Sequence, residues 1–210
     1  MLWIITAIIT SYLLGSCPTA YIFGRLLKGI DIRDFGSGNV GATNALRVLG
    51  KGPGIAVLLL DIFKGLAAVS ILGRIFGPKI PGLSREALSV LLGICCIMGH
   101  NWTIFLRFKG GKGIATSLGV LIGLAVNLQG LRIVLGLAIA TWFIAFLLTR
   151  IVSLASILSA LLLPVYMFLS GQPAILMFSS LILSFFVILR HRPNLNRLLQ
   201  GKEPRLNFRR

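Results

Sequence analysis

The chain has 210 residues, of which 56% are hydrophobic and only 12% are charged, and its mean hydropathy is +0.93. Soluble domains are about 45–50% apolar and about 25% charged, so a soluble fold of this length has too little interior for the sequence. The net charge of +16 comes from 21 Lys and Arg against 5 Asp and Glu. Because the basic residues lie between apolar runs, they are typical of membrane-protein loops and argue against nucleic acid as a partner.

Apolar runs follow one another along the chain, and most are long enough to cross a bilayer. The first covers residues 1–23, and the others lie at about 53–76, 87–106, 114–126, 133–148, 152–169 and 173–189. A transmembrane helix needs about 20 residues, or about 17 at the short end, so the 114–126 run is short. No basic residue precedes the first run, which argues against a cleaved signal peptide and predicts a first helix with its N-terminus outside.

The basic residues decide between six and seven spans. With seven, the segments 25–52, 107–113, 149–151 and 190–210 lie inside and carry 16 of the 21 Lys and Arg. Merging 114–148 into one helix would bury Arg132 and place the C-terminal basic cluster outside. The positive-inside rule therefore predicts an all-α membrane protein of seven transmembrane helices, with the C-terminus cytoplasmic. We expect one domain over 1–210, with short helices and loops forming a functional site at the cytoplasmic face.

Asp61 and Lys64 lie three residues apart inside the second predicted span, so they share one helix face. Ionisable groups within a span usually mark a functional site. A packed ion pair between helices explains them as well, and we expect the pair to be structural.

Residues 36–44 read GSGNVGATN and are followed by Arg47; we call residues 36–41 the first glycine loop. The pattern G-x-G-x-x-G is present, but no strand precedes it, so the dinucleotide-binding interpretation fails. Glycines let backbone N–H groups converge on an anion, and a short helix over 41–49 would point its N-terminus at the same place. A plain connecting loop is the alternative, and phosphate binding is the prediction we favour.

Residues 107–113, the second glycine loop, read RFKGGKG and are expected on the same side of the membrane. They do not form a nucleotide-binding P-loop, because Leu106 and Gly113 stand where glycine and Ser/Thr are needed. Lys112 remains a suitable point charge for a phosphate, although all three cations could be positive-inside anchors. After the last span, His191 and Asn194 accompany basic residues that could also hold lipid headgroups, and Pro193 is expected to begin a final helix.

The sequence lacks the residues that several types of reaction require. No G-x-S-x-G nucleophile motif occurs, and neither His100 nor His191 is followed five positions later by an acid. The acidic residues are too few and too scattered for a magnesium cage, and the three cysteines have no metal-binding spacing. We therefore predict no metal and no cofactor. The five acidic residues are Asp31, Asp34, Asp61, Glu86 and Glu203.

Three long motifs carry a family resemblance: GSGNVGATNALRVLGK at 36–51, GHNW with FKGGKG within 99–113, and HRPNLNRLLQGKEP at 191–204. VSLASI at 152–157 and LDIFKG at 60–65 add to it. Over essentially its whole length the chain resembles the bacterial acyl-phosphate:glycerol-3-phosphate acyltransferases, the integral membrane family usually called PlsY. The order and spacing of the motifs make the resemblance specific.

The resemblance implies a seven-helix enzyme of the bacterial plasma membrane. Its reaction would transfer a fatty acyl group from acyl phosphate to the 1-hydroxyl of sn-glycerol 3-phosphate, giving lysophosphatidic acid and phosphate. The family takes its donor from a soluble phosphate acyltransferase, which is an expected partner together with the lipid bilayer.

The resemblance also assigns roles to individual residues. Ser37, Arg47, Lys112 and His191 would be catalytic, and the family pattern favours the phosphate of the donor as the proton acceptor. Glu203 would have a structural part, holding the C-terminal segment in place. The acyl-phosphate group would be held by Ser37, Gly38, Asn39 and Thr43, and glycerol 3-phosphate by Arg47, Lys112, Ser153, His191 and Asn194. Further substrate-binding positions within the motifs would be Gly36, Gly41, Asn44 and Gly111.

Two other classes of function compete with this one. A transporter of a phosphorylated metabolite would use basic gates and broken helices, but it predicts polar residues at mid-membrane on several spans. A non-catalytic membrane scaffold would have no need for matched phosphate loops.

Overall fold

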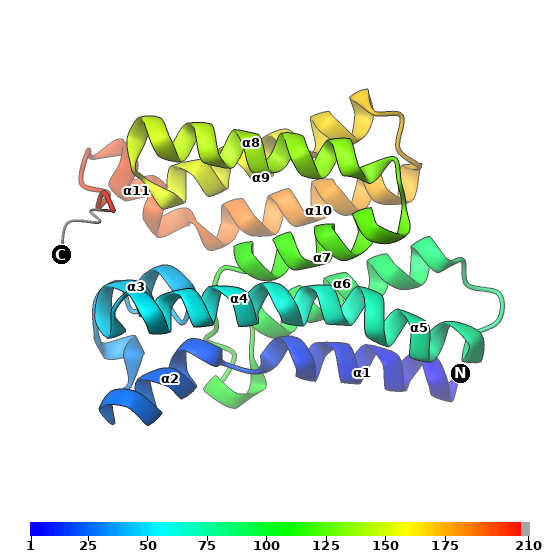
Figure 1. Ribbon diagram of the computed structural model, residues 1–210, viewed down its shortest axis with the longest axis horizontal. Coiled ribbons are helices and arrows are strands. Elements are labelled where there is room, and N and C mark those ends of the chain that lie inside the picture. The colour runs from blue at the N-terminus through cyan, green and yellow to red at the C-terminus, as the bar shows by residue number, and fades with distance from the viewer. Residues whose placement is uncertain (207–210) are drawn as a thin grey trace. The chain divides into compact units, whose positions relative to one another are not determined.

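The computed structural model describes residues 1–206, which are almost entirely helical and contain no strand (Figure 1). The chain divides into two compact units, Met1–Asn127 and Leu128–Arg210, which we call the N-terminal and C-terminal units. The predicted all-helical membrane protein is confirmed at this level.

The N-terminal unit contains the predicted spans up to residue 127 together with the two glycine loops. Its helices are α1 (Leu2–Ser16), α2 (Thr19–Lys28), η1 (Ile32–Asp34), α3 (Ala42–Leu49), α4 (Lys51–Ala67), η2 (Ala68–Leu72), α5 (Gly73–Phe76), η3 (Gly77–Lys79), α6 (Arg85–Asn101), η4 (Ile104–Leu106) and α7 (Ile114–Asn127). The short helix expected at 41–49 is present as α3.

Close backbone contacts hold the long helices of this unit together. α1 packs along α6, and α4 packs along α7. A side chain at Gly99 would collide with the Tyr12 carbonyl of α1, and one at Gly119 would collide with the Ile62 carbonyl of α4. Small residues at helix crossings are how membrane helices approach closely, so these glycines set the spacing on which the loops depend.

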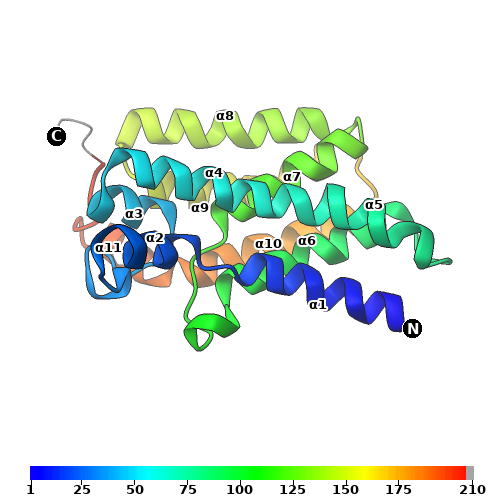
Figure 2. The same cartoon turned by 60° about the horizontal axis from the view of Figure 1, so that its bottom comes forward.

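The first apolar run is broken into two helices. α1 ends at Ser16 and α2 begins at Thr19, because Pro18 has no N–H to continue the helical ladder. The break exposes backbone carbonyls inside the unit, and two of them, on Ser16 and Cys17, accept hydrogen bonds from Thr103 and Lys64. The α6–α7 loop that carries η4 projects from the helices of this unit (Figure 2).

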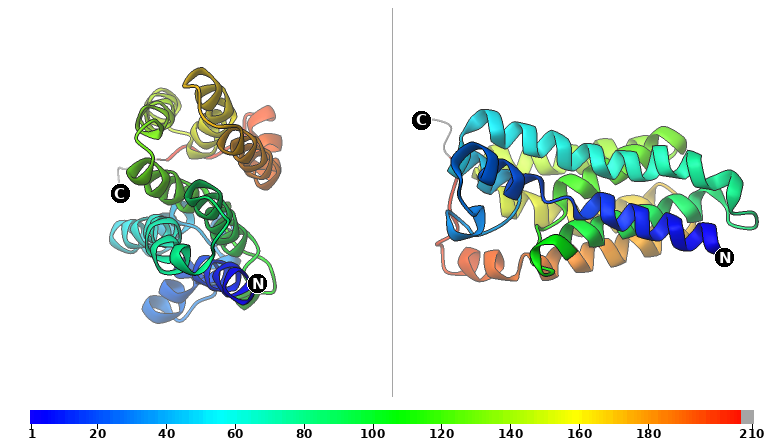
Figure 3. Two further views of the ribbon diagram at one scale, coloured as in Figure 1. Left: turned by 90° about the vertical axis from the view of Figure 1, so that its right-hand side faces the viewer. Right: turned by 90° about the horizontal axis from the view of Figure 1, so that it is seen from below.

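The C-terminal unit consists of α8 (Leu131–Thr149), α9 (Val152–Leu169), α10 (Ala174–Arg190) and α11 (Arg192–Leu199). α9 packs against both α8 and α10, and the three run side by side (Figure 3). Polar side chains join them: Trp142 Nε1 donates to Ser156 Oγ over 3.1 Å, and Ser159 Oγ donates to the Ala138 carbonyl over 2.8 Å. α11 turns away from α10 by 61° and has Pro193 in its first turn, as expected.

Within residues 1–206, five helical segments are long and apolar enough to cross a membrane, and a sixth results if the bent pair α10–α11 is one span. The remaining apolar helix, α7, has only 14 residues. A multi-pass membrane protein is therefore confirmed, whereas the count of seven spans and their orientation stay predictions. The five are Leu2–Lys28, Lys51–Lys79, Arg85–Leu106, Leu131–Thr149 and Val152–Leu169.

Candidate functional site

The first glycine loop is closed by the side chain of Asn44, which is buried in the first turn of α3. Asn44 Oδ1 accepts the Ser37 N–H over 2.8 Å, and Asn44 Nδ2 donates to the carbonyls of Ile32 and Phe35 over 3.2 and 3.1 Å. These bonds fold the loop back against the start of α3. Asn44 is therefore bound to the loop's own backbone.

Glycine is required at two positions of this loop. Gly36 and Gly38 have φ of +63° and +69°, in the left-handed region that other residues rarely adopt. A Cβ at Gly36 would also collide with Asn44 Oδ1. Ser37 is exposed between the two glycines, and Arg47 is exposed one turn after Thr43 on α3. The loop thus presents a hydroxyl, a guanidinium and the positive end of a helix, a combination that suits an anion.

An ion pair stands beside the loop that the sequence alone did not reveal. Arg33 Nη2 lies 2.6 Å from Asp31 Oδ2, and the Arg33 N–H caps η1 through Asp31 Oδ1 over 3.0 Å. The hydrogen bond from the Arg33 side chain lowers the pKa of Asp31 to about 2. The Asp31 carboxylate, five residues before the loop, is thereby neutralised by Arg33.

The second glycine loop is tied to the end of α6. The N–H groups of Gly110 and Gly111 donate to the carbonyls of Asn101 and His100 over 3.2 and 3.1 Å. Before them, Arg107 and Phe108 both have positive φ, which costs about 1–3 kcal/mol each in residues other than glycine. Lys112 is half-buried and stands two residues ahead of the first residue of α7. The strained turn and the hydrogen-bonded glycines fix the backbone position of Lys112, and therefore the point from which its side chain extends.

The predicted pair of Asp61 and Lys64 lies within a larger polar network in the N-terminal unit. Lys64 Nζ is 2.8 Å from Asp61 Oδ1, and both side chains are buried. Thr19 Oγ1 donates to the same carboxylate oxygen over 2.7 Å, and His100 Nδ1 lies 3.8 Å from it. Thr19 and His100 belong to other helices, which is why sequence spacing could not indicate them.

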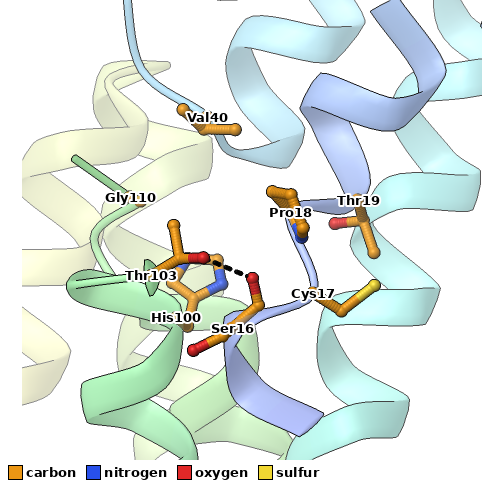
Figure 4. A pocket seen from close by; sticks show the side chains of 9 residues that line it. Ser16, Cys17, Pro18, Thr19, Val40, His100, Thr103 and Gly110 are labelled. Carbon is orange, nitrogen blue, oxygen red and sulfur yellow. Dashed lines mark hydrogen bonds between the residues drawn. The ribbon is translucent and has the colours of Figure 1, made fainter. Parts of the chain in front are cut away.

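A small pocket opens beside this network (Figure 4). His100 and Thr103 lie on one side of it and the α1–α2 break on the other, and Thr103 Oγ1 donates to the Ser16 carbonyl over 2.6 Å. Both glycine loops contribute to its wall. The lining residues are Ser16, Cys17, Pro18, Thr19, Val40, His100, Thr103, Gly110 and Gly111.

In the C-terminal unit, Glu203 joins the predicted residues to one another. Its Oε1 accepts from Ser153 Oγ over 2.7 Å and from Asn194 Nδ2 over 2.5 Å, and its Oε2 accepts from Arg197 Nε over 2.7 Å. Burial raises the pKa of Glu203, but the bonds from Ser153, Asn194 and Arg197 outweigh burial and leave it below the ordinary value. The carboxylate thus stays charged and links α9, α11 and the tail.

His191 is buried at the bend between α10 and α11. Its Nδ1 lies 2.8 Å from the carbonyl of Val187. Because a carbonyl can only accept, Nδ1 carries a proton, and the bond fixes the ring in one orientation. Any contact between His191 and a substrate would then be made through Nε2.

The sequence-predicted residues fall in two sets, one within each unit. Hydrogen bonds or ion pairs join Ser37 to Asn44, Asp61 to Lys64, and Ser153 and Asn194 to Glu203. Thr19 and Arg33 are further members that sequence reasoning missed, whereas His100 and Arg197 lie within the motifs of the family resemblance. Among the described residues no group of three His, Cys, Asp or Glu side chains could hold a metal ion. The N-terminal set is Gly36, Ser37, Gly38, Asn39, Gly41, Thr43, Asn44, Arg47, Asp61, Lys64, Gly111 and Lys112, and the C-terminal set is Ser153, His191, Asn194 and Glu203.

Comparison with known proteins gives consistent matches along the whole chain. The family model described as glycerol-3-phosphate acyltransferase matches residues 5–201. A glycerol-3-phosphate acyltransferase of Desulforudis audaxviator is 47% identical over 206 residues, covering 98% of this chain and 97% of that protein. One of Gloeobacter violaceus is 45% identical over 197 residues, covering 93% and 91%.

Two solved structures also match this chain, and both are of PlsY (YgiH), described as an integral membrane glycerol 3-phosphate acyltransferase. The glycerol 3-phosphate form is 37% identical with a TM-score of 0.84, and covers 97% of this chain and 96% of that one. The lysophosphatidic acid form is also 37% identical, with a TM-score of 0.80 and coverage of 97% and 95%.

Proposed function

Since the chain belongs to the glycerol-3-phosphate acyltransferase family and is an integral membrane acyltransferase, we propose that its acyl donor is acyl phosphate. The fatty acyl group would pass to the 1-hydroxyl of sn-glycerol 3-phosphate, and the products would be lysophosphatidic acid and inorganic phosphate. The observation that carries this proposal is the first glycine loop, braced by Asn44 over the N-terminus of α3. Such a loop suits the compact phosphate of an acyl phosphate.

The phosphate of the donor would bind at the first glycine loop. Ser37 is exposed and can donate its hydroxyl, while the first N–H groups of α3 lack helical partners and face an incoming anion. Gly38, Asn39 and Thr43 would complete the cradle. In this arrangement Asn44 serves the site by shaping the loop, because its amide already bonds to the loop backbone.

Glycerol 3-phosphate would bind through cations and through groups that recognise its hydroxyls. Arg47 and Lys112 would hold its phosphate, since charge-assisted hydrogen bonds to phosphate are the strong ones. Ser153 already donates its hydroxyl proton to Glu203, so it would accept a hydrogen bond from a glycerol hydroxyl instead. His191 and Asn194 would contact the same substrate.

The chemistry needs orientation more than a strong base. The 1-hydroxyl oxygen of glycerol 3-phosphate attacks the acyl carbonyl carbon, the bond from that carbon to the phosphate oxygen breaks, and the hydroxyl proton passes to the departing phosphate. Holding the two reactants together and stabilising the negative charge supply the rate enhancement. His191 would bind and orient the acceptor, and no group outside the protein and its two substrates is needed.

The cellular setting follows from the same reaction. We propose that the enzyme works in the bacterial plasma membrane. A soluble phosphate acyltransferase would supply its donor, because acyl phosphate is an activated anhydride that some other enzyme must make.

The test is an acyl-transfer assay on the purified protein in lipid. Glycerol 3-phosphate is offered with palmitoyl phosphate or with palmitoyl-CoA, and lysophosphatidic acid and phosphate are measured. We expect product from palmitoyl phosphate only, with loss of most activity in Lys112→Ala and little change in Lys109→Ala, an exposed lysine of the same loop. Product from palmitoyl-CoA alone would overturn the donor, and binding of glycerol 3-phosphate without any product would favour the transporter.

A further inference from the structure

The polar network around Asp61 lies directly against the second glycine loop. We infer that His100, oriented by Asp61, is a positioning residue that holds this loop so that Lys112 can bind glycerol 3-phosphate. The inference rests on the proposed function, in which Lys112 contacts the substrate phosphate. It gives the buried charges of the second span a part in substrate binding.

The His100 ring lies between the carboxylate and the loop. On one side, His100 Nδ1 is 3.8 Å from Asp61 Oδ1. On the other, a Cβ built on Gly111 would collide with His100 Nε2, so ring and loop backbone are in contact there. Lys112 is the next residue, so a shift of the His100 ring would displace the backbone of Lys112.

The main chain of the same histidine also holds the loop. The His100 carbonyl accepts the Gly111 N–H, and the Asn101 carbonyl accepts the Gly110 N–H. The end of α6 thus holds the loop by two backbone hydrogen bonds and by contact with the Nε2 edge of the His100 ring. His100 is the residue that connects these contacts with the loop to Asp61.

Asp61 is itself held from several directions. Thr19 Oγ1 and Lys64 Nζ both lie within 2.8 Å of its Oδ1, and Lys64 Nζ also donates to the Cys17 carbonyl at the α1–α2 break. A buried ion pair is a poor source of stability, because desolvation offsets its attraction, but it can specify one geometry. Here the geometry specified is that of the carboxylate facing His100.

The experiment is a double-mutant cycle on the full-length protein in lipid, read by calorimetric titration of glycerol 3-phosphate. His100→Phe keeps a ring of similar size without its nitrogens. We expect this substitution to weaken binding about 5- to 10-fold, to raise KM for glycerol 3-phosphate similarly and to leave kcat nearly unchanged. In a Lys112→Gln background the same substitution should have no further effect, since the residue acts through Lys112. Equal effects of His100→Phe in both backgrounds would overturn the inference.

Two further variants separate positioning from general packing. Ser11→Ala removes a buried hydrogen bond of 2.6 Å between α1 and α6, the helix that carries His100, and should lower the melting temperature without changing KM. His100→Asn restores a nitrogen on the side of Nδ1 and should recover part of the affinity. If both His100 variants only lower the melting temperature, as Ser11→Ala does, the role is merely structural and the inference is wrong.

The part of Asp61 in orienting His100 is tested with a variant that leaves no buried charge unpaired. Asp61→Asn with Lys64→Met removes both charges together, and we expect it to reproduce the higher KM of His100→Phe. An unchanged KM in this folded double variant would overturn the part assigned to Asp61. Because the titration needs no acyl donor, a protein that is inactive with palmitoyl phosphate but passes the cycle would refute the proposed donor and leave this inference intact.

Discussion

Asn44 and Ser37 are seven residues apart, and the side-chain oxygen of Asn44 accepts the backbone N–H of Ser37 over 2.8 Å. The same side chain donates to two carbonyls further back in the chain. One buried amide thereby determines the curvature of the loop on which the proposed donor phosphate binds.

Asn44→Asp is expected to inactivate the enzyme more than its small change in size suggests. The new carboxylate can still accept from Ser37, but its second oxygen would face the carbonyls of Ile32 and Phe35 without a proton to donate. Leaving such buried groups unsatisfied costs about 1–3 kcal/mol. Acyl transfer should fall at least about tenfold with a lower melting temperature, while the exposed Asn196→Asp serves as control. Unchanged turnover would refute the bracing role.

Gly36→Ala is expected to abolish most activity. The residue has φ of +63°, and the added methyl group would collide with Asn44 Oδ1. Backbone strain and displacement of the Asn44 side chain would therefore both disturb the loop. Left-handed strain alone costs about 1–3 kcal/mol. Gly52→Ala, where no atom lies within 4 Å of the added carbon, should be active in the same assay. Equal activity of the two variants would contradict this account.

Ser153→Ala is expected to raise KM for glycerol 3-phosphate several-fold with little change in kcat. The substitution removes one acceptor for a substrate hydroxyl, worth about 0.5–1.5 kcal/mol, together with the hydrogen bond from Ser153 to Glu203. Ser179→Ala, on α10, is the matched control because Ser179 Oγ donates within its own helix, to the Ile175 carbonyl. A fall in kcat at unchanged KM would place Ser153 in the chemical step instead.

His191→Ala is expected to weaken the binding of glycerol 3-phosphate more than it slows turnover at saturating substrate. The ring is oriented by its Nδ1 bond to the Val187 carbonyl and is proposed to orient the acceptor, not to remove its proton. Steady-state kinetics with both substrates varied measure the two effects separately. A collapse of kcat with KM unchanged would make His191 the base.

Asp31 should make the stability of the protein depend on pH in the acid range. Its hydrogen bond from Arg33 lowers the pKa from an ordinary 3.8 to about 2, so the folded state binds the proton less tightly than the unfolded state. The stabilisation is therefore fully present above about pH 4 and is lost as the pH falls towards 2. Melting temperatures measured across this range should fall less steeply for Asp31→Asn than for the unchanged protein; parallel curves would contradict the assignment.

Much of this architecture could be predicted because it is local in sequence. Hydropathy located the apolar helices, the glycines preceding Ala42 indicated the short helix α3, and Pro193 indicated the start of α11. The three-residue spacing of Asp61 and Lys64 placed both on one face, where their charged atoms are 2.8 Å apart. Each of these features depends on the period of a helix or on the backbone preference of one residue.

The contacts that could not be predicted from the sequence depend on packing between helices. Thr19 and His100 reach Asp61 from α2 and α6, across sequence separations that no spacing rule covers. The break at Pro18 was hidden because the run of apolar residues continues through it. Asn44 stays a predicted substrate-binding position, and its hydrogen bonds to Ser37, Ile32 and Phe35 could not be read from the sequence, which shows which residues are polar but not what they bond to.

The position of Lys64 one turn from Asp61 on α4 also bears on how the protein is made. A single charge at the centre of an inserting helix costs about 2.5–3.5 kcal/mol, and at the moment of insertion α6 with its histidine has not yet been synthesised. Two opposite charges on the same turn can enter lipid as a nearly neutral unit, before α6 is present. The second span thus carries its own counter-ion, and the contact with His100 is added to that pair when α6 packs beside it.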